Sequence, residues 1–229
     1  MNLLILSGVA SRYLIRVLSP LALVCSLFLV ANTALGESHA FIQSMRSSSI
    51  THVLISQSIE GEFGKVDAAV DAMTNPDGTI TPSETESKYW QGYNSKTAIG
   101  LELMKFIQFK VAHTFVNLKQ KNNSLENLRG SRLHGEFGLV FGSPLGNLEA
   151  GVGMLGAKLD YQRELESATF YGSGFGYYLG INYFISTKVS FFGQINVNEE
   201  HLVRNGGYSI VNAIDTSTSG AGLGFRIWM

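Results

Sequence analysis

The sequence predicts an all-β fold: an eight-stranded antiparallel up-and-down transmembrane β-barrel with a polar interior filled by side chains. Three observations predict it. The chain ends in a strictly alternating segment, six further alternating segments precede it, and no segment after the first 36 residues is apolar for 18 residues in a row. The last observation excludes a helical membrane protein, because a spanning helix needs roughly 20 apolar residues.

The C-terminal segment 221–229 has the clearest pattern. Successive side chains of a strand point to opposite faces of the sheet. One face is apolar and consists of Ala221, Leu223, Phe225, Ile227 and Met229. The other face carries Arg226 and Trp228 beside two glycines. An apolar outside and a polar, glycine-lined inside are typical of a membrane barrel, whose polarity is inverted relative to a soluble barrel.

Residues 1–36 are predicted to be a cleaved signal peptide. Arg12 and Arg16 precede an apolar stretch from Val17 to Ala31. Ala34-Leu35-Gly36 then supplies small residues at the two positions that a signal peptidase reads. This segment predicts export from the cytoplasm.

Two alternatives for the N-terminal segment remain open. A membrane anchor is disfavoured because the apolar stretch is shorter than a spanning helix and is interrupted by Pro20. Lipidation of Cys25 after cleavage is disfavoured because bulky Val24 precedes it and the apolar stretch continues beyond it. Cleavage after residue 36 would remove the only cysteine, so the mature chain would need no disulfide in an oxidising periplasm.

The mature chain would have roughly 190 residues, which is enough for one domain. Its formal charge would change from -1 to -3, because residues 1–36 contain two arginines and no acidic residue. Such a balance gives no electrostatic reason to expect a nucleic-acid partner. We expect residues 37–57 to be an N-terminal periplasmic segment and residues 58–229 to form the barrel.

The predicted strands follow from alternation of apolar and polar residues. They are residues 97–104, 106–118, 132–142, 147–160, 170–184, 188–198 and 221–229. Because closure of a bacterial barrel requires an even number of strands, an eighth is expected in Ser58–Ala72, with a bulge at Gly64. The alternative is that Ile50–Ile55 belongs to this first strand. A second bulge is expected at Gly156, where the alternation changes parity.

The predicted connections are of two kinds. Long polar loops follow the first, third, fifth and seventh strands, at residues 73–95, 119–128, 161–167 and 199–215. Connections of a few residues follow the others, including the turn Ser143-Pro144-Leu145-Gly146. Long outer loops and short periplasmic turns are typical of outer-membrane barrels, so both termini are expected on the periplasmic side.

Six charged residues are predicted to point inward. They are Glu102, Lys110, Arg132, Glu136, Glu149 and Arg226. An eight-stranded barrel is only wide enough for its side chains to fill, so we expect these acids and bases to pair into a polar plug rather than line an open pore.

Other patterns predict no further chemistry. The glycine-rich run 172–176 is followed by no helix, so it does not predict a phosphate-binding loop. The five histidines, at 39, 52, 113, 134 and 201, lack metal-ligand spacing. No catalytic residue, metal or cofactor is expected. Tyr171, Tyr183 and Trp228 are interpreted as aromatic residues at the membrane interface, and His113 is expected to face lipid.

The mature chain resembles the small eight-stranded outer-membrane barrels of the OmpA and OmpX type. The similarity includes the C-terminal pattern Leu223, Phe225, Ile227, Trp228 and Met229, which resembles the signal that the barrel assembly machinery recognises. The family usually ends on Phe, whereas this chain ends on Met229. The resemblance implies a monomer in the bacterial outer membrane, in contact with its lipids and lipopolysaccharide.

The expected function is a structural or surface-interaction role through the loops 73–95 and 199–215, without enzymatic activity. A lipid-modifying enzyme is the alternative, and it would need a Ser, His and acid constellation at the outer face. His113 with Thr114 and His134 with Glu136 offer only parts of one. A small-solute channel and a soluble lipocalin-like carrier are further alternatives, although the charged second face disfavours the carrier.

Overall fold

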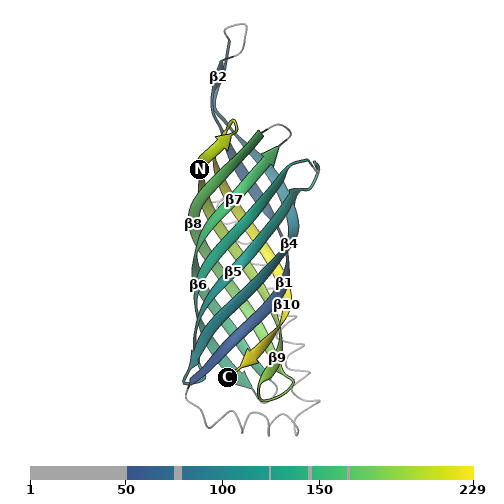
Figure 1. The fold of residues 1–229 in the computed structure, drawn as a ribbon, viewed down its shortest axis with the longest axis vertical. Helices are drawn as coiled ribbons and strands as arrows, with labels where there is room; N and C mark the ends of the chain where they lie inside the picture. The colour runs from purple at the N-terminus through teal and green to yellow at the C-terminus, as the bar shows by residue number, and fades with distance from the viewer. Residues whose placement is uncertain (1–50, 75–78, 124, 144–145, 164–165) are drawn as a thin grey trace, which may run out of the picture.

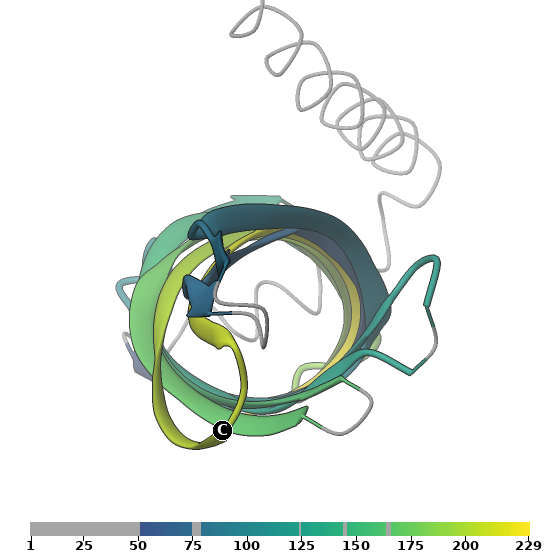
Figure 2. The ribbon, with the colours of Figure 1, turned by 90° about the horizontal axis from the view of Figure 1, so that it is seen from above.

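The computed structural model describes residues 51–74, 79–123, 125–143, 146–163 and 166–229. The predicted signal peptide and the segment 37–50 lie outside these residues. Eight long strands form one closed antiparallel barrel in the order β1-β10-β9-β8-β7-β6-β5-β4 (Figures 1 and 2). Their bounds are β1 Thr51–Val70, β4 Glu84–Leu103, β5 Ile107–Gln120, β6 Asn127–Ser143, β7 Gly146–Arg163, β8 Glu166–Phe184, β9 Val189–Tyr208 and β10 Val211–Trp228. The predicted eight-stranded all-β fold is confirmed.

A small hairpin projects from one end of the barrel. It pairs β2 (Met73–Thr74) with β3 (Ile80–Thr81) and extends beyond the rim at the end opposite the C-terminus (Figure 1). No helix within the described ranges is long and apolar enough to cross a bilayer.

The first and last strands close the ring. β1 pairs with β10 from Leu54 opposite Trp228 to Val70 opposite Val211, and Val53 and Met229 exchange two backbone hydrogen bonds of 2.9 and 2.8 Å. Because the barrel is closed, its described strands present no unpaired edge. A structure in hydrocarbon needs this, since water cannot satisfy free backbone groups there.

The first strand differs from its prediction. It starts at Thr51 rather than in 58–72, so residues 51–57 belong to the barrel. Its pairing with β4 runs through Gly64 without a shift, and Gly156 is likewise in unbroken register with both of its neighbours. The two predicted bulges are therefore wrong. At both positions the inward-facing residues change from polar to apolar along the strand. In the sequence, this change resembles a shift of the apolar residues from one face of the strand to the other.

The predicted long loops are also shorter than expected. Most of 73–95, 161–167 and 199–215 is strand, as are four residues of 119–128. The eight barrel strands are 14 to 20 residues long. A tilted strand of roughly 9 to 11 residues is enough to span a bilayer. The extra length places polar residues on the outward face, and in the sequence they resembled loops.

The barrel wall therefore has two sections. The membrane section carries an exposed apolar belt that includes Ile59, Phe63, Ile99, Phe109, Val111, Phe115, Leu133, Phe137, Val152, Met154, Phe175, Tyr177, Leu223 and Phe225. We call the strand ends beyond this belt the outer extension; they are residues 64–70, 84–92, 116–120, 127–131, 155–163, 166–174, 199–208 and 211–218. The outward face of the outer extension carries exposed charges, among them Lys65, Lys119, Arg129, Lys158, Asp160, His201 and Asp215.

Candidate functional site in the barrel interior

The candidate site is the interior, where each of the eight strands contributes a buried polar or charged side chain. From the end with the C-terminus, the interior contains an aromatic cap, a charged network, an arginine brace, an apolar layer and a polar mouth.

The aromatic cap consists of Leu54, Phe184 and Trp228. Trp228 is 2% exposed, and its indole nitrogen donates a 2.9 Å hydrogen bond to the hydroxyl of Ser190. Its ring centroid lies 5.6 Å from that of Phe184. The expectation that Trp228 lies at the membrane interface is therefore wrong, because its even position puts it on the inward face.

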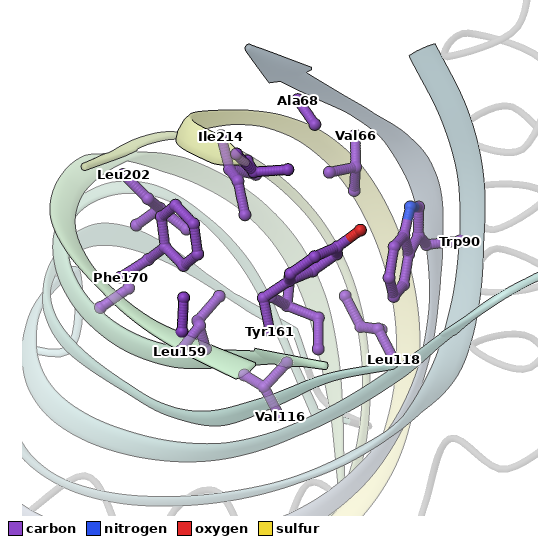
Figure 3. Close-up of a cluster of buried hydrophobic side chains, with 14 of the residues drawn as sticks. Val66, Ala68, Trp90, Val116, Leu118, Leu159, Tyr161, Phe170, Leu202 and Ile214 are labelled. Carbon is purple, nitrogen blue, oxygen red and sulfur yellow. The ribbon is translucent and has the colours of Figure 1, made fainter. Parts of the chain in front are cut away.

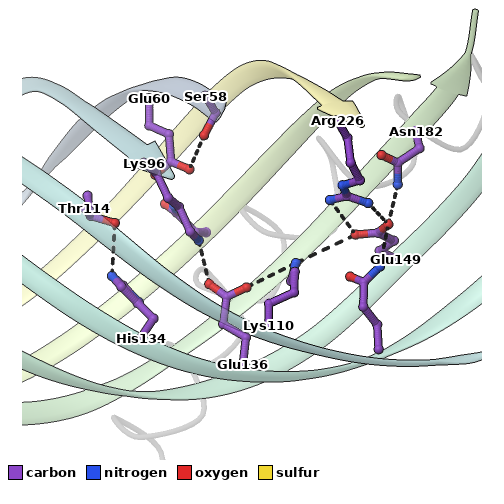
Figure 4. A network of polar contacts seen from close by, with 12 residues as sticks. Ser58, Glu60, Lys96, Lys110, Thr114, His134, Glu136, Glu149, Asn182 and Arg226 are labelled. Atoms are coloured by element: carbon purple, nitrogen blue, oxygen red, sulfur yellow. Dashed lines mark hydrogen bonds and ion pairs between the residues drawn. The ribbon is translucent and has the colours of Figure 1, made fainter. Parts of the chain in front are cut away.

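Glu149 on β7 is the centre of the first part of the charged network (Figure 4). It accepts hydrogen bonds from Arg226 on β10 and from Asn182 on β8. Gln108 lies 3.4 Å away and the ammonium of Lys110 lies 3.8 Å away, both on β5. A buried carboxylate is stable only when such donors replace its lost hydration.

Glu136 on β6 is the centre of the second part. Lys96 on β4 and Lys110 contact its carboxylate at 2.5 and 3.1 Å, so Lys110 joins the two parts (Figure 4). His134 is two residues from Glu136 on the same face of β6, and its Nε2 lies 3.2 Å from the hydroxyl of Thr114. The network thus links the four neighbouring strands β4 to β7 with β8 and β10 and leaves no charge of this group without a described partner.

The arginine brace crosses the barrel where the two sections meet. The guanidinium of Arg132 on β6 donates to both carboxylate oxygens of Glu62 on β1, at 2.8 and 2.7 Å. It also donates to both oxygens of Glu200 on β9, at 2.8 and 2.7 Å. Thr216 on β10 donates to Glu200 at 2.8 Å. Bidentate pairs of this kind hold the planar guanidinium in one orientation.

The apolar layer fills the interior of the outer extension (Figure 3). Its members include Val66, Trp90, Val116, Leu118, Leu128, Leu155, Leu159, Tyr161, Phe170, Leu202, Val211 and Ile214. Phe170, Leu202 and Ile214 are 0% exposed. The ring of Tyr161 lies 6.2 Å from those of Trp90 and Phe170, which is the usual range for aromatic pairs.

The polar mouth lies beyond this layer at the outer rim. Lys88 contacts Glu86 at 2.8 Å and Glu126 at 3.1 Å, and Arg163 contacts the same two carboxylates at 3.3 and 3.5 Å. The hydrogen bond from Lys88 holds the pKa of Glu86 below its usual value, although partial burial opposes this shift. The cluster orders the strand ends of β4, β6 and β7 around the opening.

All six charges singled out from the sequence point into the interior: Glu102, Lys110, Arg132, Glu136, Glu149 and Arg226, each at most 7% exposed. The structure brings four of them into the charged network and places Arg132 in the brace above it. Glu102 is buried near the end with the C-terminus, at 1% exposed.

Among the described residues, sequence reasoning missed five buried charges, Glu60, Glu62, Lys96, Glu126 and Glu200. Glu126 was assigned to the loop 119–128. Lys96 stands one residue before a predicted strand, so extending the alternation by one position finds it. Glu60 and Glu62 are on the face of β1 opposite to that of Ile59, Gly61 and Phe63. The alternation in this strand was too irregular to show which face points inward. Glu200 was assigned to a loop, and nothing in its local pattern distinguishes the strand end from a polar loop.

One small cavity lies in the described part of the interior. A cavity between Lys96, His134 and Asn196 has a volume of about 10 Å³, which is room for about one water molecule. Among the described residues, no group of three or more His, Cys, Asp or Glu side chains is arranged to hold a metal ion.

Comparisons with known proteins extend only to the fold. No protein-family model matches the sequence, and no curated protein matches it. Similar solved structures include Neisserial surface protein A, with 12% identity, coverage of 78% of this chain and 97% of that chain, and a TM-score of 0.44. The outer membrane protease OmpT from Escherichia coli has 10% identity, the same coverages and a TM-score of 0.41. Ail of Yersinia pestis has 14% identity, coverages of 75% and 97%, and a TM-score of 0.35.

Proposed function

We propose that this chain is a bacterial outer-membrane barrel that does not conduct solutes and that holds a rigid extension above the membrane for surface interaction. The closed ring and the apolar belt support the membrane location, because the ring satisfies the backbone and the belt exposes a largely apolar surface to hydrocarbon. The outward polar residues Gln57 and Thr97 within the belt are hydrogen-bonded to each other. In this proposal the short turns and both termini are periplasmic, the segment 1–36 is removed during export, and the C-terminal pattern 223–229 directs assembly.

The outer extension, rather than long loops, would provide the interaction surface. It is made of paired strands and ends in the β2–β3 hairpin, so a partner would meet a preordered surface and little ordering entropy would be lost on binding. Exposed Lys65, Lys119, Arg129 and Lys158 lie on its outward face. These cations support contact with the phosphate groups of lipopolysaccharide.

The observation that carries the closed-barrel proposal is the arginine brace below the apolar layer. Arg132 spans the interior between β6, β1 and β9, and the layer above it contains side chains that are 0% exposed. An ion crossing the barrel would have to break the four hydrogen bonds that Arg132 makes to Glu62 and Glu200. It would also have to displace the apolar layer, which is not hydrated. A small-solute channel is therefore the weaker alternative.

Two measurements on the refolded mature chain test this proposal. Electrophoresis with and without boiling should give different mobilities, because a closed hydrogen-bonded ring resists mild detergent. Planar bilayers containing the folded form should show little or no steady conductance. Unchanged mobility would contradict the membrane barrel, whereas large and stable single-channel openings would contradict only the plug and favour a channel.

A further inference from the structure

We propose that the outer wall of the barrel carries an ester-hydrolase site formed by Ser173, His201 and Asp215, which acts on the acyl esters of lipids in the outer leaflet. The three residues lie on the adjacent strands β8, β9 and β10. Ser173 is directly opposite His201, and His201 is directly opposite Asp215. All three side chains are on the exposed outward face of the outer extension.

The pair formed by His201 and Asp215 has the geometry of an activated base. His201 Nδ1 lies 2.6 Å from Asp215 Oδ1, and both side chains are 64% exposed. A carboxylate that accepts from Nδ1 fixes the tautomer in which Nε2 is free to accept a proton. Asp215 is thus a positioning residue that acts through His201.

Ser173 is placed to be the nucleophile. Cβ atoms of directly opposite residues on neighbouring antiparallel strands are about 4.5 to 5.5 Å apart. Ser173 and His201 are therefore direct neighbours, and the proposal requires side-chain rotation to bring the hydroxyl of Ser173 to Nε2 of His201, on the side of the ring that faces away from Asp215. The order Ser, His, Asp across three strands therefore reproduces the relation of nucleophile, base and orienting acid.

The surroundings of Ser173 leave room for a substrate carbonyl. The residue opposite Ser173 on β7 is Gly156, and a Cβ atom placed there would meet no atom nearer than 4.0 Å. The ammonium of Lys158, two residues further along β7, lies 5.5 Å from the ring centroid of Tyr171. Lys158 is directly opposite Tyr171 and therefore diagonal to Ser173, so its cationic side chain can attract an anionic headgroup to this part of the wall.

The position of Ser173 along its strand indicates a lipid substrate. The next outward residue toward the membrane is Phe175, which is 60% exposed and ends the apolar belt on β8. The site thus lies immediately above the hydrocarbon, at the depth where the acyl esters of a membrane lipid are found. This assignment rests on the proposed membrane orientation, whereas the triad itself does not.

The reaction is an ester hydrolysis with water as the second substrate. His201 Nε2 takes the proton of Ser173 as Oγ attacks the carbonyl carbon. The ester C–O bond breaks, and His201 returns the proton to the departing alcohol, which leaves an acyl group on Ser173. Water, deprotonated by His201, attacks this acyl group, so that the fatty acid is released and the Ser173 hydroxyl is restored.

The triad is tested first on the refolded mature chain in detergent micelles, which needs no membrane orientation. The probes are a p-nitrophenyl acyl ester and a fluorophosphonate, with the labelled peptide identified by mass spectrometry. We expect labelling at Ser173 and ester hydrolysis that falls about 10³-fold or more in S173A and H201Q. D215E should recover more of the rate than D215A, which a merely structural role of Asp215 would not produce.

Matched controls are S217A, at the next outward position along β10 from Asp215, and H113Q on β5, neither of which belongs to the triad. Both should keep wild-type hydrolysis, and all variants should keep the mobility shift on boiling, which shows that they are folded. Hydrolysis no faster than in S173A, or equal labelling in H201Q and wild type, would overturn the proposal while leaving the membrane barrel intact.

The lipid source is distinguished with vesicles. One set contains phosphatidylethanolamine and phosphatidylglycerol, and the other contains lipopolysaccharide in addition. Fatty acid released from either set, and absent with S173A, supports the lipid assignment and identifies the source as phospholipid or acylated saccharide. Hydrolysis of the soluble ester without release from either set would overturn the lipid assignment.

Discussion

The membrane section and the outer extension are built from the same strands but have opposite polarity. In the membrane section of β1, Phe63 points outward and Glu62 inward; just beyond it, Lys65 points outward and Val66 inward. The backbone register continues without a break across this boundary. The alternation of inward and outward side chains thus continues through both sections. Whether the outward face is apolar or polar depends on the medium that surrounds that section.

This difference implies that the two sections are stabilised differently. In the outer extension, water surrounds the wall, so burial of the apolar layer is driven by the hydrophobic effect as in a soluble barrel. In the membrane section, under the proposed function, the apolar face would already be in contact with lipid. There the interior depends on hydrogen bonds and ion pairs, since an unpaired buried charge is costly.

The largest expected effects come from removing one interior anchor in each section. Arg132→Leu leaves Glu62 and Glu200 buried without their partner and should lower the free energy of unfolding by about 3 to 5 kcal/mol. Phe170→Ala leaves a cavity in the apolar layer and should cost a similar amount, about 3 to 5 kcal/mol. Urea unfolding of the protein folded into vesicles measures both.

A combined variant separates the two causes. Adding Glu62→Gln and Glu200→Gln to Arg132→Leu should recover much of the loss, whereas the same changes should not rescue Phe170→Ala. Arg129→Leu, an exposed arginine of the outer extension, is the matched control and should change stability by about 0.5 kcal/mol or less. Equal losses in R129L and R132L would show that the brace does not stabilise the barrel.

Outward positions should respond to a new charge according to their section. Phe109→Arg places a charge in hydrocarbon and should cost about 2 to 4 kcal/mol near the bilayer midplane. Tyr89→Arg, at a 68% exposed outward position of the outer extension, should be within about 0.5 kcal/mol of wild type. Comparable costs at the two positions would contradict the boundary between the sections.

A smaller, stabilising effect is expected at the turn between β4 and β5. Met104 and Lys105 have φ values of 51° and 65°, and Phe106 donates a 3.2 Å hydrogen bond to the carbonyl of Leu103. This conformation favours Asn-Gly. Replacing Met104-Lys105 with Asn-Gly should stabilise the barrel by about 1 kcal/mol. A loss of stability in the same urea assay would be evidence against this turn geometry.

The smallest effect concerns pH at the polar mouth. Because the pKa of Glu86 is lowered in the folded state, its contribution to stability is present above its unfolded pKa and is lost as pH falls through the lower folded value. Trp90 lies in the apolar layer near this cluster, so its emission in a W228F background should change on acidification below about pH 4.5. Glu86→Gln should remove that part of the change; an identical titration in E86Q would exclude Glu86 as its cause.

The sequence was sufficient for the fold class and for the direction of most inward charges. Alternation placed Lys110, Arg132 and Glu149 correctly, because in the membrane section the two faces differ sharply in polarity. It failed at Gly64 and Gly156, where an inward apolar residue follows an inward polar one and the direction of the strand is ambiguous without its neighbours. Register across strands was also invisible, and only register brings Ser173, His201 and Asp215 together.

The most direct test of the two-section account is the accessibility of single cysteines along β1. The only natural cysteine is Cys25, within the predicted signal peptide, so a mature chain cleaved as predicted has no thiol of its own. On intact cells, an impermeant maleimide should label a cysteine at outward position 65 but not at outward position 59 or inward position 66. Rapid labelling at position 59, or protection of position 65, would contradict the boundary between a lipid-facing and a water-facing wall.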